Sequence, residues 1–465
     1  MRSGGTFIFR RDNSRSIVCR EYRLILTTLV CAVGLLLPPA SAQDSGREDE
    51  SLLEAIEELS LRVDSLEKEK AAAEKKAGSS LLVSWKNGLR FESEDGTFSV
   101  AINGKIQTDW GFQSGTRDLD AHVESHGDDL NDGVEFRRTR LVLSGHLHER
   151  FLYKTDYEFS GGDVDFKDVY IGLKALSMNI TLKVGHFKEP VSLESNTGEA
   201  SLRLMERSLM QALSPSRNTG LGLFGTILDE RMTWGTGVFF NTDSYGDGGG
   251  DGDLSASARV TGLPWYGGDD RLLHLGLSYS RRGEDDIQFT AGPESHRSPD
   301  YIDTDGFVGG LSPHAVSMDA ADLFGSETAF ALGPFSAQAE YLLMNVDGPG
   351  GADSILWGGY VEGGFFLTGE HRAYHRKKGA FHEVTPSSDF LSDEGGPGAW
   401  EVTARVSCID LDDADIRHGG EMINYSAGIN WFLNPSVRLS TNYIHSRLEH
   451  VGSARLFLLR LALMF

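Results

Sequence analysis

Apolar and polar residues alternate along the largest part of the chain. In FSVAINGKIQTDWGF (98–112) the even positions are mostly apolar, and the odd positions include Lys105 and Asp109. In FLYKTDYEF (151–159) most odd positions are aromatic, and the even positions from Lys154 to Glu158 are charged. Successive side chains of a strand point to opposite faces. This period of two therefore predicts β-strands with one apolar and one polar face.

The alternation recurs in sixteen segments. These are 97–112, 135–147, 151–160, 166–174, 179–187, 218–226, 231–241, 254–263, 271–282, 327–332, 334–346, 354–368, 398–409, 421–434, 435–447 and 453–465. Many run for nine to fourteen residues, whereas strands of soluble sheets usually have about five or six. A tilted strand of about 9–11 residues crosses a bilayer, so the longer segments could each span a membrane.

Short and long connections alternate between these segments. Residues 148–150 and 175–178 form short connections, whereas 113–134 and 188–217 are long. Outer-membrane barrels have short turns on one side of the membrane and long loops on the other. The pattern predicts an all-β fold, a 16-stranded antiparallel transmembrane β-barrel over residues 97–465.

The last ten residues, LFLLRLALMF, contain one arginine in an apolar run. Leu461, Leu463 and Phe465 fall on odd positions, whereas Arg460 falls on an even one. A strand would therefore turn the leucines to lipid and Arg460 to the barrel interior. In a water-filled interior the charge of Arg460 would cost little free energy. We therefore expect this segment to be the closing strand.

One connection breaks the rule of short turns. Strand parity assigns 369–397 to the periplasmic side, yet this segment is long and contains the basic cluster EHRAYHRKK. Long loops within a tight architecture are usually functional or disordered. The segment is interpreted either as a cationic constriction at the inner mouth or as an ordinary solvated basic loop.

The N-terminus has the pattern of a signal peptide. Six arginines precede the apolar stretch 24–37, and Ala40-Ser41-Ala42 supplies a small-residue cleavage site. Residues 1–42 are therefore assigned to a signal peptide, with a short membrane anchor as the alternative. No later window is apolar for long enough to form a transmembrane helix.

A helical segment is predicted next, over residues 44–77. Its apolar residues are spaced alternately by four and three, which is a heptad repeat; they are Leu52, Ile56, Leu59, Val63 and Leu66. The repeat predicts a short coiled coil that packs against other copies, with a solvated single helix as the alternative. Residues 78–96 are interpreted as a linker to the barrel.

Composition narrows the function classes. The chain carries a net charge of −24, which argues against nucleic-acid binding. Removing the signal peptide leaves Cys408 as the only cysteine, so no intramolecular disulfide is possible. No G-x-S-x-G motif is present. We therefore expect a non-enzymatic protein without a metal or another cofactor.

The predicted interior face is rich in basic residues. These are Lys105, Arg138, Arg140, Lys154, Lys174, Lys183, Arg259, Arg282, Arg405, Arg438 and Arg460. The acids on this face are Asp109, Asp156, Glu158, Asp168, Glu340, Glu362 and Glu401. A basic pore wall favours anions. Alternatively, the arginines face acids on an inserted loop and create a transverse field with only mild ion preference.

Several segments resemble the phosphate-selective porin O and P family. They are GVEFRRTRLVLSG (133–145), VGHFKEPVSLES (184–195), LMERS (204–208), SPSRNTGLGLFG (214–225), GGFFLTGEHRAY (363–374) and GINWFLNPSVRLSTNYIHS (428–446). The resemblance implies a homotrimeric outer-membrane barrel whose loop 188–217 folds into the pore. It also implies that part of 283–326 and the connection 369–397 fold inward, and that the barrel assembly machinery reads Phe465.

The resemblance carries over only part of an anion site. It implies that Arg138 and Arg140 are wall arginines, that Asp168 is a wall aspartate, and that Arg207 lies on the inserted loop. The phosphate-specific members carry a lysine after Leu-Glu and then a serine pair. Here the lysine position holds Ser195, and Glu199 takes a serine position. A carboxylate there would repel a dianion.

The expected function is passive, anion-preferring diffusion of small solutes, with phosphate or polyphosphate as candidates. The constriction loop is assigned Ser195, Thr197 and Glu199, and the predicted partners are small anionic solutes and outer-membrane lipid. The alternative is a structural or adhesive barrel with a plugged pore and a coiled coil that contacts the cell wall. Conductance across a planar bilayer would distinguish the two.

Overall fold

The computed structural model describes residues 57–69, 81–85, 88–175, 179–248, 254–283, 286–304, 316–317, 320–348, 353–390, 392–393, 395–413, 416 and 418–465. The chain divides into two units, 1–76 and 77–465. In the first unit, residues 57–69 form a helix with exposed side chains. The predicted signal peptide lies outside the described residues, and the coiled coil stays a prediction. No described helix is both long and apolar enough to cross a bilayer.

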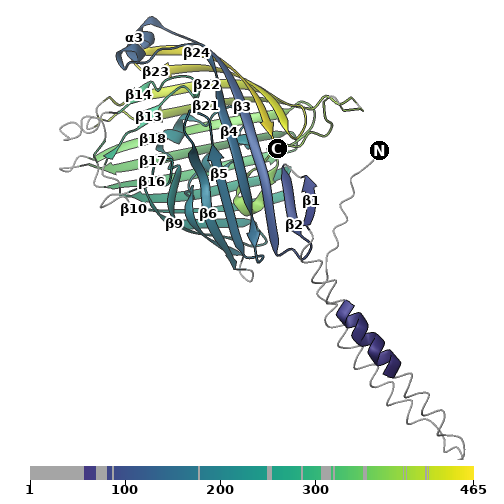
Figure 1. Ribbon diagram of the computed structural model, residues 1–465. Coiled ribbons are helices and arrows are strands. Elements are labelled where there is room, and N and C mark those ends of the chain that lie inside the picture. Colours follow the sequence, from purple (N-terminus) through teal and green to yellow (C-terminus); the bar gives the residue numbers. More distant parts are fainter. Residues whose placement is uncertain are drawn as a thin grey trace, which may run out of the picture. The chain divides into compact units, whose positions relative to one another are not determined.

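The second unit is a closed antiparallel barrel of sixteen strands (Figure 1). The strands are β3 (Phe98–Gly115), β4 (Gly133–Leu147), β5 (Phe151–Glu158), β6 (Asp165–Ala175), β7 (Ile180–Lys188), β8 (Arg217–Ile227), β9 (Met232–Phe240), β10 (Leu254–Gly268), β11 (Arg271–Arg282), β16 (Ala320–Leu332), β17 (Phe335–Asp347), β18 (Asp353–Phe366), β21 (Ala399–Asp410), β22 (Glu421–Phe432), β23 (Val437–Leu448) and β24 (Gly452–Met464). The last strand pairs with the first, from Met464 opposite Lys105 to Ala454 opposite Gly115. The predicted barrel is confirmed.

The period of two separates an outer from an inner face. In β24 the side chains of Phe457 and Leu461 are 48% and 45% exposed, whereas Arg460 is 4% exposed. The expectation of a water-filled surrounding for Arg460 is wrong. Its guanidinium lies in a packed network with Asp109 and Glu206, because an inserted loop fills the space beside it.

Two strand predictions need correction. The tenth strand was expected at 327–332, but β16 begins at Ala320 and pairs along its whole length with β17. The predicted linker 78–96 contains a hairpin of β1 (Leu81–Trp85) and β2 (Leu89–Ser93). This hairpin forms because β3 extends beyond the end of β24, so the free edge of β3 from Ser99 to Ile102 pairs with β2.

Four connections carry short elements of their own. The elements are α3 (Arg117–Ser125); α4 (Leu193–Asn196), η1 (Glu199–Ser201) and η2 (Leu209–Leu213); β12 (Asp286–Ile287), β13 (Thr290–Ala291), β14 (Ile302–Asp303) and β15 (Val316–Ser317); and β19 (Tyr374–His375), η4 (Arg376–Lys378) and β20 (Ala380–Phe381). The second group lies in the loop between β7 and β8, which we call the constriction loop (189–216).

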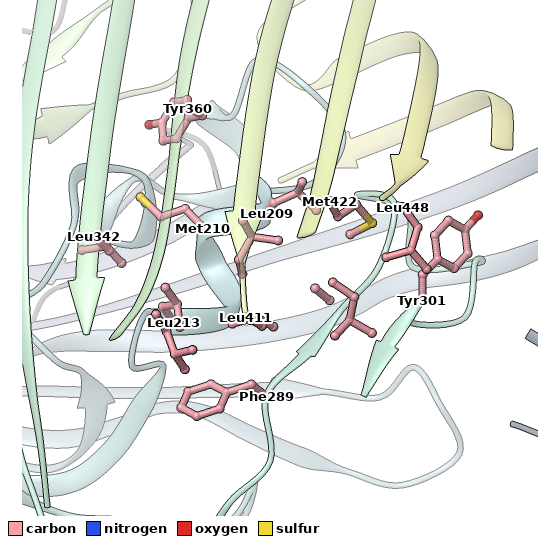
Figure 2. Packing of buried hydrophobic residues seen from close by; sticks show 14 of the residues in the cluster. Leu209, Met210, Leu213, Phe289, Tyr301, Leu342, Tyr360, Leu411, Met422 and Leu448 are labelled. Atoms are coloured by element: carbon pink, nitrogen blue, oxygen red, sulfur yellow. The ribbon is translucent and has the colours of Figure 1, made fainter. Parts of the chain in front are cut away.

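One sector of the interior is packed with apolar side chains (Figure 2). Leu209 and Met210 of the constriction loop meet Leu342 of the wall, and Phe289 and Tyr301 of the loop after β11 join them. At Gly358 in β18 an added Cβ would lie 3.1 Å from the Cα of Met210. The absence of a side chain there lets η2 approach the wall closely, so the loop is held by apolar packing.

The constriction loop also meets the connection 369–397. Leu193 of α4 belongs to a second apolar cluster with Tyr374, Ala380 and Phe381. The hydroxyl of Tyr374 and the ring of His274 in β11 form a hydrogen bond of 2.6 Å. Part of the connection 369–397 therefore lies against the inner wall, which excludes a loop that is solvated along its whole length.

Candidate functional site

A cavity of about 980 Å³ lies between the inner wall from β3 to β10 and the inserted segments. Its cationic lining residues are Lys105, Lys154, Lys174, Lys183, Lys188, Arg217, Arg259, Lys377 and Lys378. Its acidic lining residues are Asp156, Asp168, Glu199 and Glu383. Although the whole chain is acidic, the wall of this cavity is basic, and this makes it the candidate site.

Glu199 of the constriction loop is surrounded by cations from three strands. Its carboxylate lies 3.3 Å from Lys105 in β3, 3.3 Å from Arg140 in β4 and 3.9 Å from Arg217 in β8. Burial alone would raise the pKa of the Glu199 carboxyl, but Arg140 and Lys105 hold it well below its usual range. Glu199 is therefore ionised, and it offsets cationic charge that would otherwise face the cavity.

Glu206, further along the constriction loop, also pairs with cations of the wall. Its carboxylate lies 2.9 Å from Arg137, 3.3 Å from Arg138 and 2.6 Å from Arg460. Arg137 and Arg138 both reach the interior because the register of β4 against β3 shifts between Gln107 and Thr108. Such a β-bulge re-aims one side chain, so alternation alone could not predict that Arg137 points inward.

Asp168 of β6 forms a third cluster. It accepts hydrogen bonds from Lys154 at 2.6 Å and from Arg217 at 2.7 Å. Lys154 also lies 3.6 Å from Asp156. The predicted wall aspartate therefore fixes two cations at the edge of the cavity and neutralises part of their charge.

The remaining wall arginines predicted for the pathway hold the inserted segments. Arg405 lies 3.2 Å from Glu194 and 2.6 Å from Glu294. Arg438 donates to the backbone carbonyls of Leu202 and Arg203 in the constriction loop. Both guanidinium groups bind partners within the barrel, so they position the loop.

Two further wall arginines, in β10 and β11, also contact inserted segments. Arg259 in β10 lies 2.7 Å from Glu327 and also donates to the carbonyl of Gly379 in the connection 369–397. Arg282 in β11 lies 3.3 Å from Glu189 at the start of the constriction loop. Arg282, like Arg405, therefore pairs with an acid of an inserted segment, whereas the acid partner of Arg259 lies in wall strand β16.

Four lysines differ from these arginines. Lys174, Lys183, Lys188 and Lys378 line the cavity, and none of them forms an ion pair with another residue that the structure describes. The ammonium of Lys183 lies 4.8 Å from the ring centroid of Tyr170 and 4.5 Å from that of Phe224. We call these four residues the lysine row.

Two members of the lysine row have further contacts that matter. Lys188, at the end of β7, donates to the carbonyl of Ser195 in the constriction loop. Burial, and then the charge of Lys154, lower the pKa of Lys378 in η4. Ammonium groups with open coordination in a confined aqueous space can replace part of the hydration of an anion.

Two of the three residues assigned to the constriction do not face the cavity. Ser195 donates its hydroxyl hydrogen to Gln211, and Thr197 donates its own to the carbonyl of Leu193, so both serve the internal structure of the loop. Neither lines the cavity, whereas Glu199 does. Arg207 donates to two carbonyls of its own loop, those of Glu194 and Thr197.

Sequence reasoning missed four cationic groups of the interior. Lys188 and Arg217 lie just outside the strand bounds drawn from alternation, where parity assigns no face. Arg137 is turned inward by the bulge. Lys378 was seen as part of a basic cluster, but only the inward fold of 369–397 brings it to the cavity.

Comparison with known proteins gives the context of this geometry. The family model for phosphate-selective porin O and P matches residues 106–463. Porin O of Pseudomonas aeruginosa is 25% identical over 404 residues, covering 80% of this chain and 89% of that protein. An uncharacterized protein of Caulobacter vibrioides is 27% identical over 382 residues, covering 78% and 71% respectively.

A solved structure has a similar fold. A high-pH structure of Pseudomonas putida OprB superposes with a TM-score of 0.50 and 10% sequence identity. The match covers 80% of this chain and 95% of that one. At this identity the likeness concerns the barrel architecture and says nothing about individual side chains.

Proposed function

Because the chain belongs to the phosphate-selective porin O and P family and is an outer-membrane porin, we propose that it passes small anions passively, with the lysine row as the anion pathway. Inorganic phosphate and short polyphosphates are the candidate solutes. The proposal concerns a channel and includes no enzymatic step. The constriction loop and the connection 369–397 narrow the pathway from two sides.

The observation that carries this proposal is the contrast between paired arginines and unpaired lysines. When two carboxylates pair with one arginine, as at Arg405, they cancel most of its attraction for a passing anion. The lysine row lines the cavity, and no carboxylate of the described residues lies within 4 Å of its ammonium groups. Fixed cations in a narrow aqueous space attract anions and repel cations, so anion preference follows from the lysines rather than from the total of wall arginines.

A second candidate function has one observation in its favour. The apolar cluster around Met210 and Tyr301 closes a sector of the lumen, as a plugged structural or adhesive barrel would require. Absence of conductance across a planar bilayer would support this candidate. Under either function we propose a homotrimer, a coiled coil formed by the heptads of 52–66, and recognition of the C-terminal strand by the barrel assembly machinery.

The test removes one unpaired charge from the cavity. In planar bilayers with a KCl gradient, Lys183→Gln should move the zero-current potential away from the chloride value. The control Arg455→Gln removes a cation from the exposed outer face of β24 and should leave this potential unchanged. Equal potentials for wild type and Lys183→Gln would remove the lysine row from the pathway.

A further inference from the structure

Glu199 stands apart from the other loop carboxylates because it lines the cavity. Glu194 and Glu206 also pair with wall arginines, but neither borders the cavity. Glu199 borders the cavity and also a small void of about 10 Å³ beneath Arg460. Its carboxylate is therefore the constriction-loop acid closest to the route of a passing ion.

The cations around Glu199 have the arrangement of an anion site. Lys105, Arg140 and Arg217 converge from three strands on its two oxygens, and Lys188 and Arg207 add positive potential at longer range. Convergent lysine and arginine donors are what a phosphate or a carboxylate requires. In this chain, the carboxylate of Glu199 occupies the position on which these donors converge.

The ion pairs of Glu199 are also looser than others in the barrel. They measure 3.3, 3.3 and 3.9 Å, whereas Arg140 holds Glu158 at 2.6 Å and Arg460 holds Asp109 at 2.6 Å. Arg140 is thus already satisfied by a shorter bond to Glu158. A competing anion would need to displace only the weaker contacts of Glu199.

We propose that Glu199 is a tethered counter-ion that occupies an anion position in the lumen and thereby sets how tightly the pore holds small oxyanions. The inference rests on the proposed function and deepens it. A free oxyanion must compete with a carboxylate attached to the loop, which keeps binding weak and release fast. The charge of Glu199 is then a determinant of specificity.

The experiment measures how inorganic phosphate blocks chloride current through single channels. Glu199→Gln keeps the shape of the side chain and removes its charge. Removing one like charge at this distance in a partly aqueous site should tighten phosphate block by roughly tenfold. Glu199→Ser is a second neutral variant, with the same expectation, should the glutamine variant fail to assemble.

Two controls separate this effect from nonspecific changes. Glu199→Asp keeps the charge and should show phosphate block close to that of the wild type. Glu149→Gln changes the net charge by the same amount at an exposed turn and should also leave the block unchanged. Unaltered block in both neutral variants of Glu199 would overturn the inference.

Failure of the proposed function gives a different result. If wild-type channels lack anion preference, the lysine row loses its role. The proposed role of Glu199 is tested separately, by the change in phosphate block between the wild type and the neutral variants. A tighter block in those variants supports the inference, and an unchanged block refutes it.

Discussion

Arg460 lies in the closing strand with its guanidinium between Asp109 and Glu206. The two contacts each measure 2.6 Å, and Arg460 also donates to the carbonyl of Met205. Buried charges are tolerated when they are paired and hydrogen-bonded. This arginine therefore joins β24, β3 and the constriction loop, and its main contribution is to the folded structure.

Replacing Arg460 should destabilise the barrel. Arg460→Met would leave Asp109 without its partner and remove one cation from Glu206, and breaking a buried pair in this way costs about 3–5 kcal/mol. Unfolding by urea, followed by tryptophan fluorescence in lipid vesicles, measures the change. Arg455→Met, on the exposed outer face of the same strand, should alter stability by less than about 0.5 kcal/mol. Equal losses in the two variants would contradict a structural role specific to Arg460.

The lowered pKa of Lys378 predicts how the anion preference of the channel depends on pH. Burial and the charge of Lys154 lower the pKa of Lys378, and the protonated form is the one that carries the charge. Its charge is therefore lost at a lower pH than that of an ordinary lysine, whose pKa is about 10.4. Anion preference should fall as the pH rises into the alkaline range below that value.

The variant Lys378→Gln should begin with weaker anion preference at neutral pH and lose less of it on alkalinisation. Arg455→Gln is the control, because Arg455 lies on the exposed outer face of β24 and does not border the cavity. Zero-current potentials measured across the pH range provide the comparison. Parallel curves for the wild type and Lys378→Gln would exclude Lys378 from this response.

At the scale of elements, the strands were predictable and the contacts of the loops were not. Alternation identified the two faces of β11 and β24 because each strand is long and its outer face is apolar. The bulge at Arg137 was missed because one extra residue shifts the parity within a single strand. The ion pair between Arg405 and Glu294 joins residues far apart in the chain, and alternation contains no information about such pairs.

The constriction loop offers a prediction at this scale. Met210 is fully buried against the wall, and Met210→Asp would place an unpaired charge in the apolar cluster. The loop should detach from this sector, and single-channel conductance should rise and become noisier. Met210→Leu conserves the apolar volume and should conduct as the wild type does. Unchanged conductance in Met210→Asp would show that apolar packing does not hold the loop.

At the scale of the whole molecule, net charge and local charge have opposite signs. The chain carries −24, yet the wall of the cavity is basic. The barrel, the family and the basic interior could be predicted because each depends on local patterns. Which cations remain unpaired depends on the folded positions of three inserted segments, so the lysine row emerged only from the structure.

The zero-current potential of the wild-type channel in a KCl gradient tests the central claim most directly. Purified protein is inserted into a planar bilayer with different KCl concentrations on the two sides. If unpaired lysines line the conducting route, the potential should lie toward the chloride equilibrium value. A potential at or toward the potassium value, or no conductance at all, would contradict the account.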